Sequence, residues 1–236
     1  MQFISEAIGL ALALVVNLDP DLIEIVLLSL RISTSAVIAA CLIGLPLGAI
    51  LAVTRFPGRN PAIILVNALM GLPPVVAGLI VYLYLSRSGP LGFLGLLYTP
   101  TAMIIAQTIL IAPIVTALSR QIMEDMHVEY AEQFRSLGIT RIQSVQALIR
   151  DARIPLVTVA LAGFGRAVAE VGAVMIVGGN IDHLTRVMTT AITLETSKGE
   201  LALALALGIV LMIIALGVNA VVHSVKIHSE RRAYAA

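Results

Sequence analysis

Residues 201–222 read LALALALGIVLMIIALGVNAVV, an apolar stretch without a charged side chain. A helix needs about 20 mostly apolar residues to cross the hydrocarbon core of a bilayer, and this stretch supplies them. Because the stretch is apolar on every face, it does not suit a surface helix of a soluble protein. Three further segments have the same character, and a fourth is slightly short and is expected to extend toward Pro100 and Arg120. These segments are Ile32–Val53, Ala62–Leu85, Leu156–Val177 and the shorter Thr101–Leu118.

The composition of the whole chain agrees with a membrane protein. Of its 236 residues, 59% are hydrophobic and 12% are charged, whereas soluble domains carry about 25% charged residues. Cys41 is the only cysteine, which excludes a disulfide within one chain and a cysteine-based metal site. The four histidines are scattered without the spacing of metal ligands, so no metal site is expected. The sequence therefore predicts one all-α integral membrane domain.

The N-terminal segment Phe3–Val16 is apolar but too short to assign as a span. It could cross the bilayer, lie in the interface, or form the core of an uncleaved signal. Cleavage is not expected, because no Lys or Arg precedes the segment and residues 17–19 make a poor cleavage site. We therefore expect an N-terminal apolar segment at 1–21, a transmembrane domain at 22–226 and a cytoplasmic tail at 227–236.

Basic residues indicate the orientation, because cytoplasmic loops of membrane proteins are rich in Lys and Arg. If the five spans alternate, ten basic residues fall on one side: two in loop 54–61, five in segment 119–155 and three in the tail. The other side holds Arg87, Arg186 and Lys198. We expect a multi-pass protein of the inner cell membrane whose long loop and C-terminus face the cytoplasm.

Segment 121–154 is predicted to form two short helices separated by a turn. Gly138 supplies a C-cap for the first helix, and Thr140 with Gln143 fits a capping box that opens the second. Two interpretations stay open: a helical hairpin packed on the membrane interface, or an amphipathic element that docks in a groove of a partner. An apolar stripe at helical spacing comprises Met123, Met126, Tyr130, Phe134 and Leu137, and Ile142, Val145 and Ile149 continue it.

Residues 132–138, EQFRSLG, resemble the EAA loop of ABC importer permeases, with Glu132 and Gly138 at its defining positions. The resemblance implies that this loop is the coupling helix that docks on a separate ATPase subunit. A glutamine and a phenylalanine replace the small residues after the glutamate, and Gly138 and Pro155 stand 17 positions apart, about one helical turn more than is usual. The implied coupling residues are Tyr130, Glu132, Phe134, Leu137, Gly138 and Ile139.

Other parts of the chain carry the same resemblance. Residues 71–78 (GLPPVVAG) resemble the second core helix of molybdate- and sulfate-type permeases, and residues 163–173 (GFGRAVAEVGA) resemble the fourth. Residues 180–190 (NIDHLTRVMTT) are more similar to tungstate permeases. The resemblance, which covers about residues 22–226, implies a five-helix type I ABC importer permease core, to which Phe3–Val16 could add a sixth helix. It implies tungstate as the transported oxyanion, with molybdate and then sulfate as alternatives.

Arg166 and Glu170 are ionisable residues inside the fourth predicted span, where charges are costly and suggest a functional site. Their spacing places both on one helix face. Arg166 could balance an anion in transit while Glu170 sets its position, or the two could form a structural ion pair that fixes helix packing. The structural ion pair is favoured, because a strong fixed cation would trap a dianion that a conduit must release.

Three further kinds of residue are candidates for the pathway. Pro73 and Pro74 are expected to kink or interrupt the second span, as a hinge or gate or as a static kink. Gly163 permits close helix approach and is interpreted mainly as a packing residue. The hydroxyls of Thr189 and Thr193 suit an oxyanion, or they cap a short helix. The candidate pathway or gate residues are thus Pro73, Pro74, Gly163, Arg166, Glu170, Thr189 and Thr193.

The chain contains no G-x-x-x-x-G-K-[ST] segment and no convincing pair of nucleophile and base. We therefore expect a transport subunit, not an enzyme, with no catalytic residue, no cofactor of its own and no nucleic-acid partner. Five or six helices make a thin wall, so two copies are expected to enclose a pathway in the lipid bilayer. The resemblance adds an ATPase subunit that uses ATP and a periplasmic or extracellular oxyanion-binding protein.

Two other protein classes stay open as alternatives. An ion-coupled secondary transporter or channel would place Arg166 and Glu170 at a midplane site. The absence of inverted repeats and the presence of the EAA-like loop count against that class. A membrane-embedded enzyme is a weaker alternative, because no catalytic residues are evident.

Overall fold

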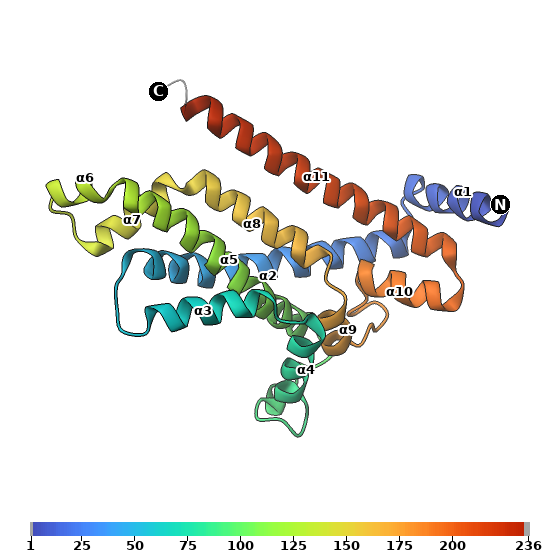
Figure 1. The fold of residues 1–236 in the computed structure, drawn as a ribbon. Coiled ribbons are helices and arrows are strands. Elements are labelled where there is room, and N and C mark those ends of the chain that lie inside the picture. Colours follow the sequence, from blue (N-terminus) through green and yellow to red (C-terminus); the bar gives the residue numbers. More distant parts are fainter. Residues whose placement is uncertain (1, 234–236) are drawn as a thin grey trace. The chain divides into compact units, whose positions relative to one another are not determined.

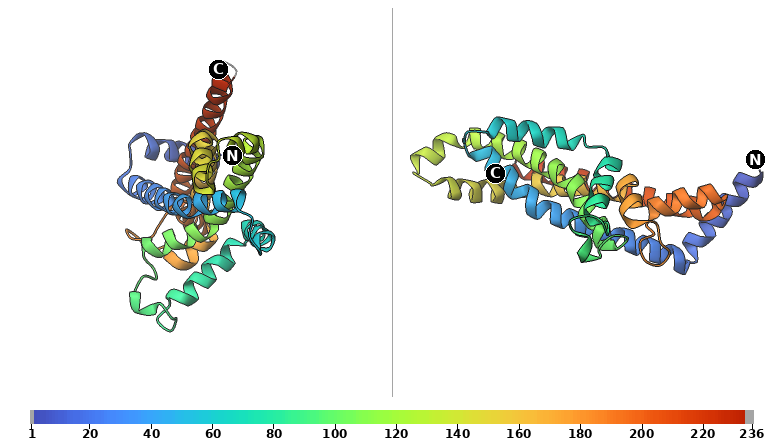
Figure 2. Two further views of the ribbon diagram at one scale, coloured as in Figure 1. Left: turned by 90° about the vertical axis from the view of Figure 1, so that its left-hand side faces the viewer. Right: turned by 90° about the horizontal axis from the view of Figure 1, so that it is seen from below.

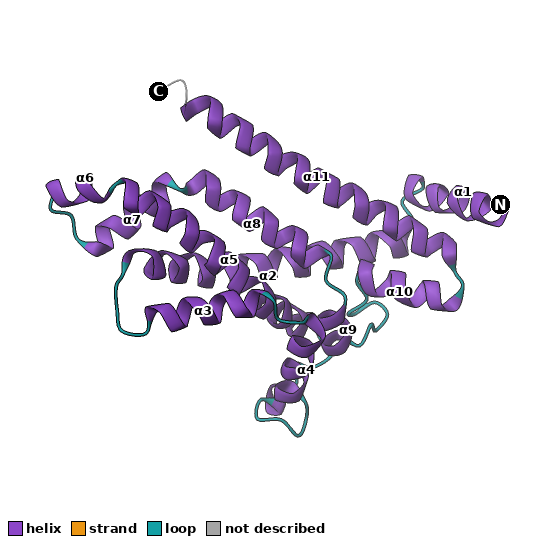
Figure 3. Cartoon of the chain, in the orientation of Figure 1, coloured by secondary structure: helices purple, strands orange, loops and turns teal. Residues whose placement is uncertain are grey.

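The computed structural model describes the backbone of residues 2–233 and the side chains of residues 8–140, 142–221 and 224. Within these residues every regular element is a helix (Figure 1, Figure 3), which confirms the all-α prediction. The elements are α1 (Gln2–Val16), α2 (Pro20–Val53), α3 (Arg59–Met70), α4 (Pro74–Leu85), η1 (Gly92–Leu94), α5 (Pro100–Glu129), α6 (Ala131–Ser136), α7 (Arg141–Asp151), α8 (Arg153–Val168), α9 (Gly172–Gly178), α10 (Met188–Lys198) and α11 (Leu201–Ala233).

Among the described residues, three helices are long and apolar enough to cross a membrane alone: α2, α5 and the part of α11 up to Val221. Two bent pairs give two further spans if each pair crosses as one, namely α3 with α4, bent by 102°, and α8 with α9, bent by 60°. By length and composition, this agrees with the five-span prediction. α1 covers the predicted N-terminal segment and has 15 residues, fewer than the about 20 that a straight span needs.

α2 begins at Pro20 rather than at the predicted Ile32. The carboxylate of Asp19 accepts hydrogen bonds from the backbone N–H groups of Asp21 (3.1 Å) and Leu22 (3.2 Å), and proline suits the first helical position because its missing N–H would have no partner there. The prediction followed hydropathy alone and missed this start, since charged residues in the first turns lower the local hydropathy.

Both bent pairs bear on the predicted spans. The prediction that Pro73 and Pro74 interrupt the second span is confirmed, because α4 begins at Pro74 after an extended Pro73. The prediction of one helix over Leu156–Val177 is wrong, since α8 ends at Val168 and α9 begins at Gly172. Side-chain hydrogen bonds from distant parts of the chain hold this second break, as described below.

The loop between α5 and α8 also differs in part from its prediction. Residues 121–129 continue α5 instead of forming a separate short helix, and the chain turns at Tyr130 into α6. The capping box of Thr140 and Gln143 is present at the start of α7. Gly138 has φ of 61°, the left-handed conformation that glycine adopts after a helix. These two local predictions are confirmed.

The chain forms two compact units, which are described separately. Unit 1 comprises residues 1–36, 73–107 and 165–219. Within it, α4 packs along α9 in all the views of Figures 1 and 2. Unit 2 comprises residues 37–72, 108–164 and 220–236.

Unit 2 contains an apolar core beside the α6–α7 loop. Fully buried side chains of Met123 on α5 and Leu148 on α7 meet the alanines of α2 there. Ser119 and Gly44 also lie close, since Ser119 Oγ donates to the Gly44 carbonyl at 3.4 Å. The core thus fixes α7 against the ends of α2 and α5. Its buried members are Ala49, Ala52, Val53, Met123, Leu148, Ala152 and Leu156.

Candidate functional site

α4 and α9 approach each other closely at two glycines. A Cβ atom on Gly78 would lie 2.8 Å from the Cα of Ala173, and a Cβ on Gly172 would lie 2.9 Å from Cγ2 of Val75. Contacts this short would force the helices apart, because interiors are close-packed and resist extra atoms. The two helices can therefore pack this tightly only with glycine at positions 78 and 172.

The carbonyl of Pro73 pairs with backbone N–H groups in the first turn of α4. It accepts the N–H groups of Val76 (3.0 Å) and Ala77 (3.1 Å), and Pro74 at the first helical position has no N–H that would need a partner. The break before α4 thus leaves these polar groups paired, which irregular backbone at membrane depth requires. This geometry suits either a hinge or a static kink.

The break between α8 and α9 is held by three side chains that pair with its backbone. Gln107 Nε2 on α5 donates to the Ala167 carbonyl at 3.1 Å. Glu170 Oε1 accepts the backbone N–H of Ala173 at 3.2 Å, and Thr189 Oγ1 at the start of α10 donates to the Glu170 carbonyl at 2.7 Å. Because unpaired backbone groups are costly away from water, these bonds explain how a helix break without proline is stable here.

Arg166 and Glu170 form an ion pair, as the sequence predicted for the structural alternative. Glu170 lies beyond the end of α8, however, so the prediction that both residues share one helix face is wrong. The Glu170 side chain is 3% exposed, whereas the Arg166 side chain is 37% exposed. The carboxylate is thus fully engaged by Arg166 and the Ala173 N–H, while part of the guanidinium faces outward.

The remaining predicted pathway residues have packing or bonding roles within the chain. Thr193 Oγ1 donates to the Thr189 carbonyl at 3.0 Å, which links the two threonines along α10. Their hydroxyl hydrogens are therefore committed to backbone carbonyls rather than free for an anion. Gly163 lies in unit 2, where a Cβ would stand 3.1 Å from Ile111, so it provides a close contact between α8 and α5. The structure thus links Arg166, Glu170, Thr189 and Thr193 through bonds.

The loop between α9 and α10 contains the residues that resemble tungstate permeases. The completely buried Thr185 holds this loop in place. Its hydroxyl donates a hydrogen bond to the Gly178 carbonyl at 2.6 Å and accepts one from the Ile181 N–H at 2.9 Å. The backbone of Asn180 and His183 is left-handed, with φ of 52° and 54°. Such a conformation is uncommon outside glycine and clusters at functional sites.

His183 connects this loop to α2. Its Nδ1 lies 2.9 Å from Oε2 of Glu24. The hydrogen bond and negative charge of Glu24, with further negative charge from Asp182 and Asp21, raise the pKa of His183 above its ordinary value. Arg186 pairs with Asp182 at 2.7 Å in the same loop. Among the described residues, no group of three or more His, Cys, Asp or Glu could hold a metal ion.

The predicted coupling residues fall into a half-buried set (Tyr130, Phe134 and Ile139) and an exposed set (Glu132, Leu137 and Gly138). The rings of Tyr130 and Phe134 meet edge to face at 5.7 Å between centroids and pack on the core of unit 2. Leu137 is 73% exposed, and Glu132 and Gly138 are exposed beside it. The predicted apolar stripe is therefore not continuous: Leu137, Ile142 and Ile149 are exposed, whereas Val145 packs on the unit 2 core. Ile142 and Val128, which are 73% and 72% exposed, add to the exposed apolar surface around the loop.

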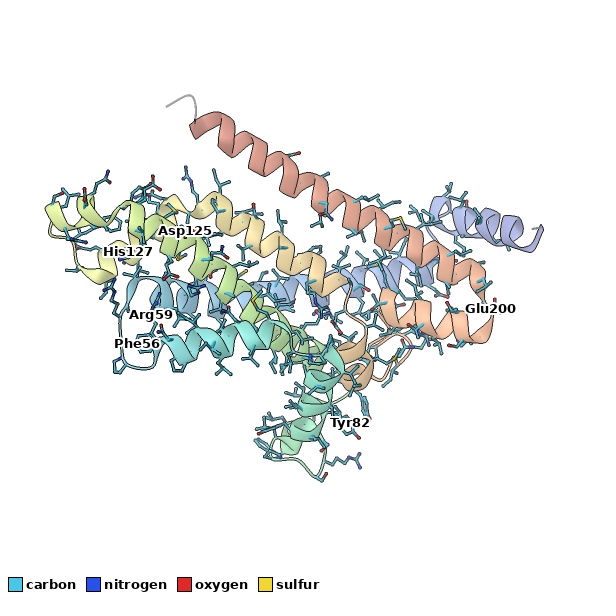
Figure 4. The ribbon with its side chains drawn as sticks, viewed as in Figure 1. Phe56, Arg59, Tyr82, Asp125, His127 and Glu200 are labelled. Atoms are coloured by element: carbon cyan, nitrogen blue, oxygen red, sulfur yellow. The ribbon has the colours of Figure 1, made fainter. Side chains whose placement is uncertain are left out.

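A charge network in unit 2 was not predicted. Glu124 on α5 accepts a hydrogen bond from Arg59 Nη2 at 2.7 Å and is also paired with Arg120. Arg59, which Figure 4 labels, lies at the start of α3, and its Nε donates to the Leu51 carbonyl at 2.7 Å. This arginine therefore ties the end of α2 to α5. The spacing of Arg120 and Glu124 was a local signal for the i,i+4 pair, but nothing local indicated Arg59.

Gln107 is a further residue that the sequence analysis missed. It is 3% exposed and lies within the mostly apolar residues 101–118 of α5. A single amide in this apolar stretch was the available signal, because polar side chains inside a span bond to other helices or mark a pathway. Gln107, Glu170 and Thr189 together form the polar site of unit 1, which also includes Ser29 and Ser33 on α2.

Comparison with known proteins agrees with this architecture. A chain from an inward-facing structure of the MetNI methionine ABC transporter matches with a TM-score of 0.68 at 20% identity, covering 87% of this chain and 96% of that one. At that identity, the likeness concerns the fold.

Sequence relatives match over most of the chain. The tungstate uptake system permease protein of Peptoclostridium acidaminophilum is 39% identical over 96% of this chain and 99% of its own length, and that of Campylobacter jejuni is 39% identical over 96% and 95%. A probable anion ABC transporter permease protein of Haloferax volcanii is 41% identical over 84% and 88%. The family model for the binding-protein-dependent transport system inner membrane component matches residues 44–232. The chain therefore belongs to the family of inner membrane components of binding-protein-dependent transport systems.

Proposed function

We propose that this chain is the permease subunit of an ATP-driven importer for tungstate. The observation that carries the proposal is the match along nearly the whole chain to tungstate uptake permeases of two organisms. Membership of a binding-protein-dependent transport family favours ATP-driven over ion-coupled transport. Molybdate is the nearest alternative, since both ions are tetrahedral dianions of similar size, and sulfate follows it. A conduit that binds weakly has little basis for separating these ions, so selectivity would lie mainly in the binding protein.

The pathway of this importer would use Arg166 as its charged contact. Its guanidinium is partly exposed, while its partner Glu170 is buried and bonded on both oxygens. The carboxylate offsets much of the positive charge, so a dianion would be attracted without being trapped. Pro73, Pro74 and the α4–α9 pair would line or gate the passage, and two copies of the chain would enclose it.

Energy would reach the pathway through the loop between α5 and α8. Tyr130 and Phe134 anchor this loop on the core of unit 2, and the exposed Glu132, Leu137 and Gly138 would contact an ATPase subunit that binds and hydrolyses ATP. The exposed apolar side chains suit insertion into a groove of that partner. An external oxyanion-binding protein would deliver the ion to the opposite face.

The uptake of oxyanions by cells tests the proposal. Cells lacking the chromosomal gene for this chain, but keeping the genes for its ATPase and binding protein, would receive either wild type or the Gly138→Val variant, which strains the left-handed position 138. Cellular tungsten, molybdenum and sulfur would be measured at low external oxyanion concentrations. We expect wild type to restore tungsten uptake and Gly138→Val to do so poorly.

The matched control is Gly217→Ala, because a Cβ at Gly217 has open space around it. This variant should restore uptake like wild type. Restoration of molybdenum or sulfur uptake with no change in tungsten would refute the proposed substrate. Full tungsten uptake after deletion of the ATPase gene would refute the ATP-driven mechanism.

A further inference from the structure

The polar site of unit 1 encloses a small cavity that no proposed pathway role explains. Its lining includes the hydroxyl-bearing Ser29, Ser33 and Thr189 and the side chains of Gln107 and Glu170. All five residues are buried, with exposures between 2% and 6%. The cavity has room for about one water molecule, so an oxyanion with four oxygens does not fit it.

Gln107 presents an unpaired acceptor to this cavity. Its Nε2 is fixed by the hydrogen bond to the Ala167 carbonyl, and its Oε1 is buried without a hydrogen-bond partner among the described residues. The opposite placement of the amide would set two oxygens against each other, so the acceptor must point away from Ala167. A buried acceptor without a donor is costly, which calls for a ligand that donates a hydrogen bond.

The neighbouring groups decide the chemical class of that donor. Thr189 Oγ1 already donates to the Glu170 carbonyl, and Ser29 Oγ donates to the Ile25 carbonyl at 2.7 Å. Neither hydroxyl hydrogen is therefore available to Gln107. A cation would remain uncompensated, because the charge of Glu170 is already balanced by Arg166. An anion would face the carboxylate and the amide oxygen and would be repelled.

We propose that this cavity binds one water molecule, which donates to Gln107 Oε1 and makes Gln107 the positioning residue of the α8–α9 break. The water would bridge the amide to another cavity-lining oxygen, such as the Ser33 hydroxyl, and so join α5 to α2 at the level of the break. Gln107 Nε2 donates to the Ala167 carbonyl at the end of α8, and Gln107 Oε1 accepts a hydrogen bond from the buried water. One side chain thus bonds to both. The inference does not depend on which oxyanion is transported.

High-resolution structures of the whole transporter test this site. In wild type, we expect an ordered water within about 2.7–3.2 Å of Gln107 Oε1, unchanged when sodium in the buffer is replaced by choline. In Gln107→Leu, the water and the bond to Ala167 should both be lost, and the Tm of the complex should fall. Thr116→Val is the matched control, because Thr116 is also buried on α5 and its hydroxyl donates to the Ala112 carbonyl of its own helix. This variant should keep the water.

Four results would overturn the proposal, and three of them need only the wild-type protein. A protein donor bonded to Gln107 Oε1, or a cavity that lacks density at a resolution that shows other buried waters, would exclude the site. Density that disappears in choline buffer would identify a cation instead. A Tm for Gln107→Leu equal to those of wild type and Thr116→Val would remove the positioning role.

Discussion

At the scale of single residues, Glu170 connects the parts of the α8–α9 break. One carboxylate oxygen accepts the Ala173 N–H, the other pairs with Arg166, and the backbone carbonyl accepts the Thr189 hydroxyl. Removal of such a group leaves its partners buried and unpaired, which costs more than the bonds contribute while intact. The main effect of Glu170 is therefore expected on the stability of the break.

The Glu170→Ala variant should be less stable by about 1–3 kcal/mol, because the buried N–H of Ala173 loses its acceptor. Thermal unfolding of the purified transporter in detergent would measure this change. Glu200→Ala is the control, since Glu200 is an exposed carboxylate in the same unit, and it should unfold like wild type. Equal stability of the two variants would contradict the role assigned to Glu170.

His183 should make stability depend on pH. Because its pKa is raised in the folded protein, the stabilisation is fully present below the ordinary value of about 6.5 and is lost as pH rises through the raised pKa. The Tm of wild type minus that of His183→Asn should therefore be positive at low pH and approach zero at high pH. Asparagine is the chosen replacement because it tolerates the left-handed backbone. A constant difference across this range would exclude the titration.

At the scale of elements, α4 and α9 form a pair whose spacing is set by glycine. Gly78→Ala places a Cβ against the backbone of Ala173 and should destabilise the protein by about 1–3 kcal/mol through overpacking. Gly165→Ala is the matched control, because its Cβ would meet no atom within 4 Å, and it should be neutral or slightly stabilising. Denaturation of both variants in the same detergent compares them, and similar losses would show that packing at Gly78 is loose.

Two residues in and beside α6 have different expected roles: Phe134 anchors the loop on the unit 2 core, and Leu137 contacts the ATPase subunit. Phe134→Ala should lower stability by about 1–2 kcal/mol, because its half-buried ring packs on Tyr130 and the unit 2 core. Leu137→Ser should leave stability unchanged, since Leu137 is 73% exposed, but should reduce the amount of ATPase subunit that co-purifies. Unfolding and pull-down assays on both variants check this pair of outcomes. Retention of the ATPase by Leu137→Ser at wild-type level would remove Leu137 from the docking surface.

At the scale of the whole molecule, the distribution of basic residues predicts which segments face the cytoplasm. In a Cys41→Ala background, Ser136→Cys on α6 and Phe93→Cys on η1 would each carry one cysteine, and both positions are exposed. A membrane-impermeant maleimide should label Phe93→Cys in intact spheroplasts and Ser136→Cys only in inverted vesicles. The reverse pattern would invert the proposed orientation and place the coupling loop outside.

The sequence alone determined the properties that depend on neighbouring residues. Apolar stretches, the Pro73–Pro74 interruption, the left-handed Gly138 and the Thr140–Gln143 capping box all follow from groups within a few positions of each other. Motif patterns along the chain also indicated the transporter family, which the comparisons confirm. Hydropathy did not reveal the true start of α2, because a side-chain cap at Asp19 set it.

Only the tertiary structure decided the break between α8 and α9 and the charge network in unit 2. Gln107 reaches a carbonyl 60 positions away, and Arg59 reaches a carboxylate 65 positions away. The physical reason is that a helix without proline can break at membrane depth only where other groups pair with the freed backbone N–H and C=O groups. Hydropathy and spacing describe one segment at a time, so they cannot show which distant side chain supplies that partner.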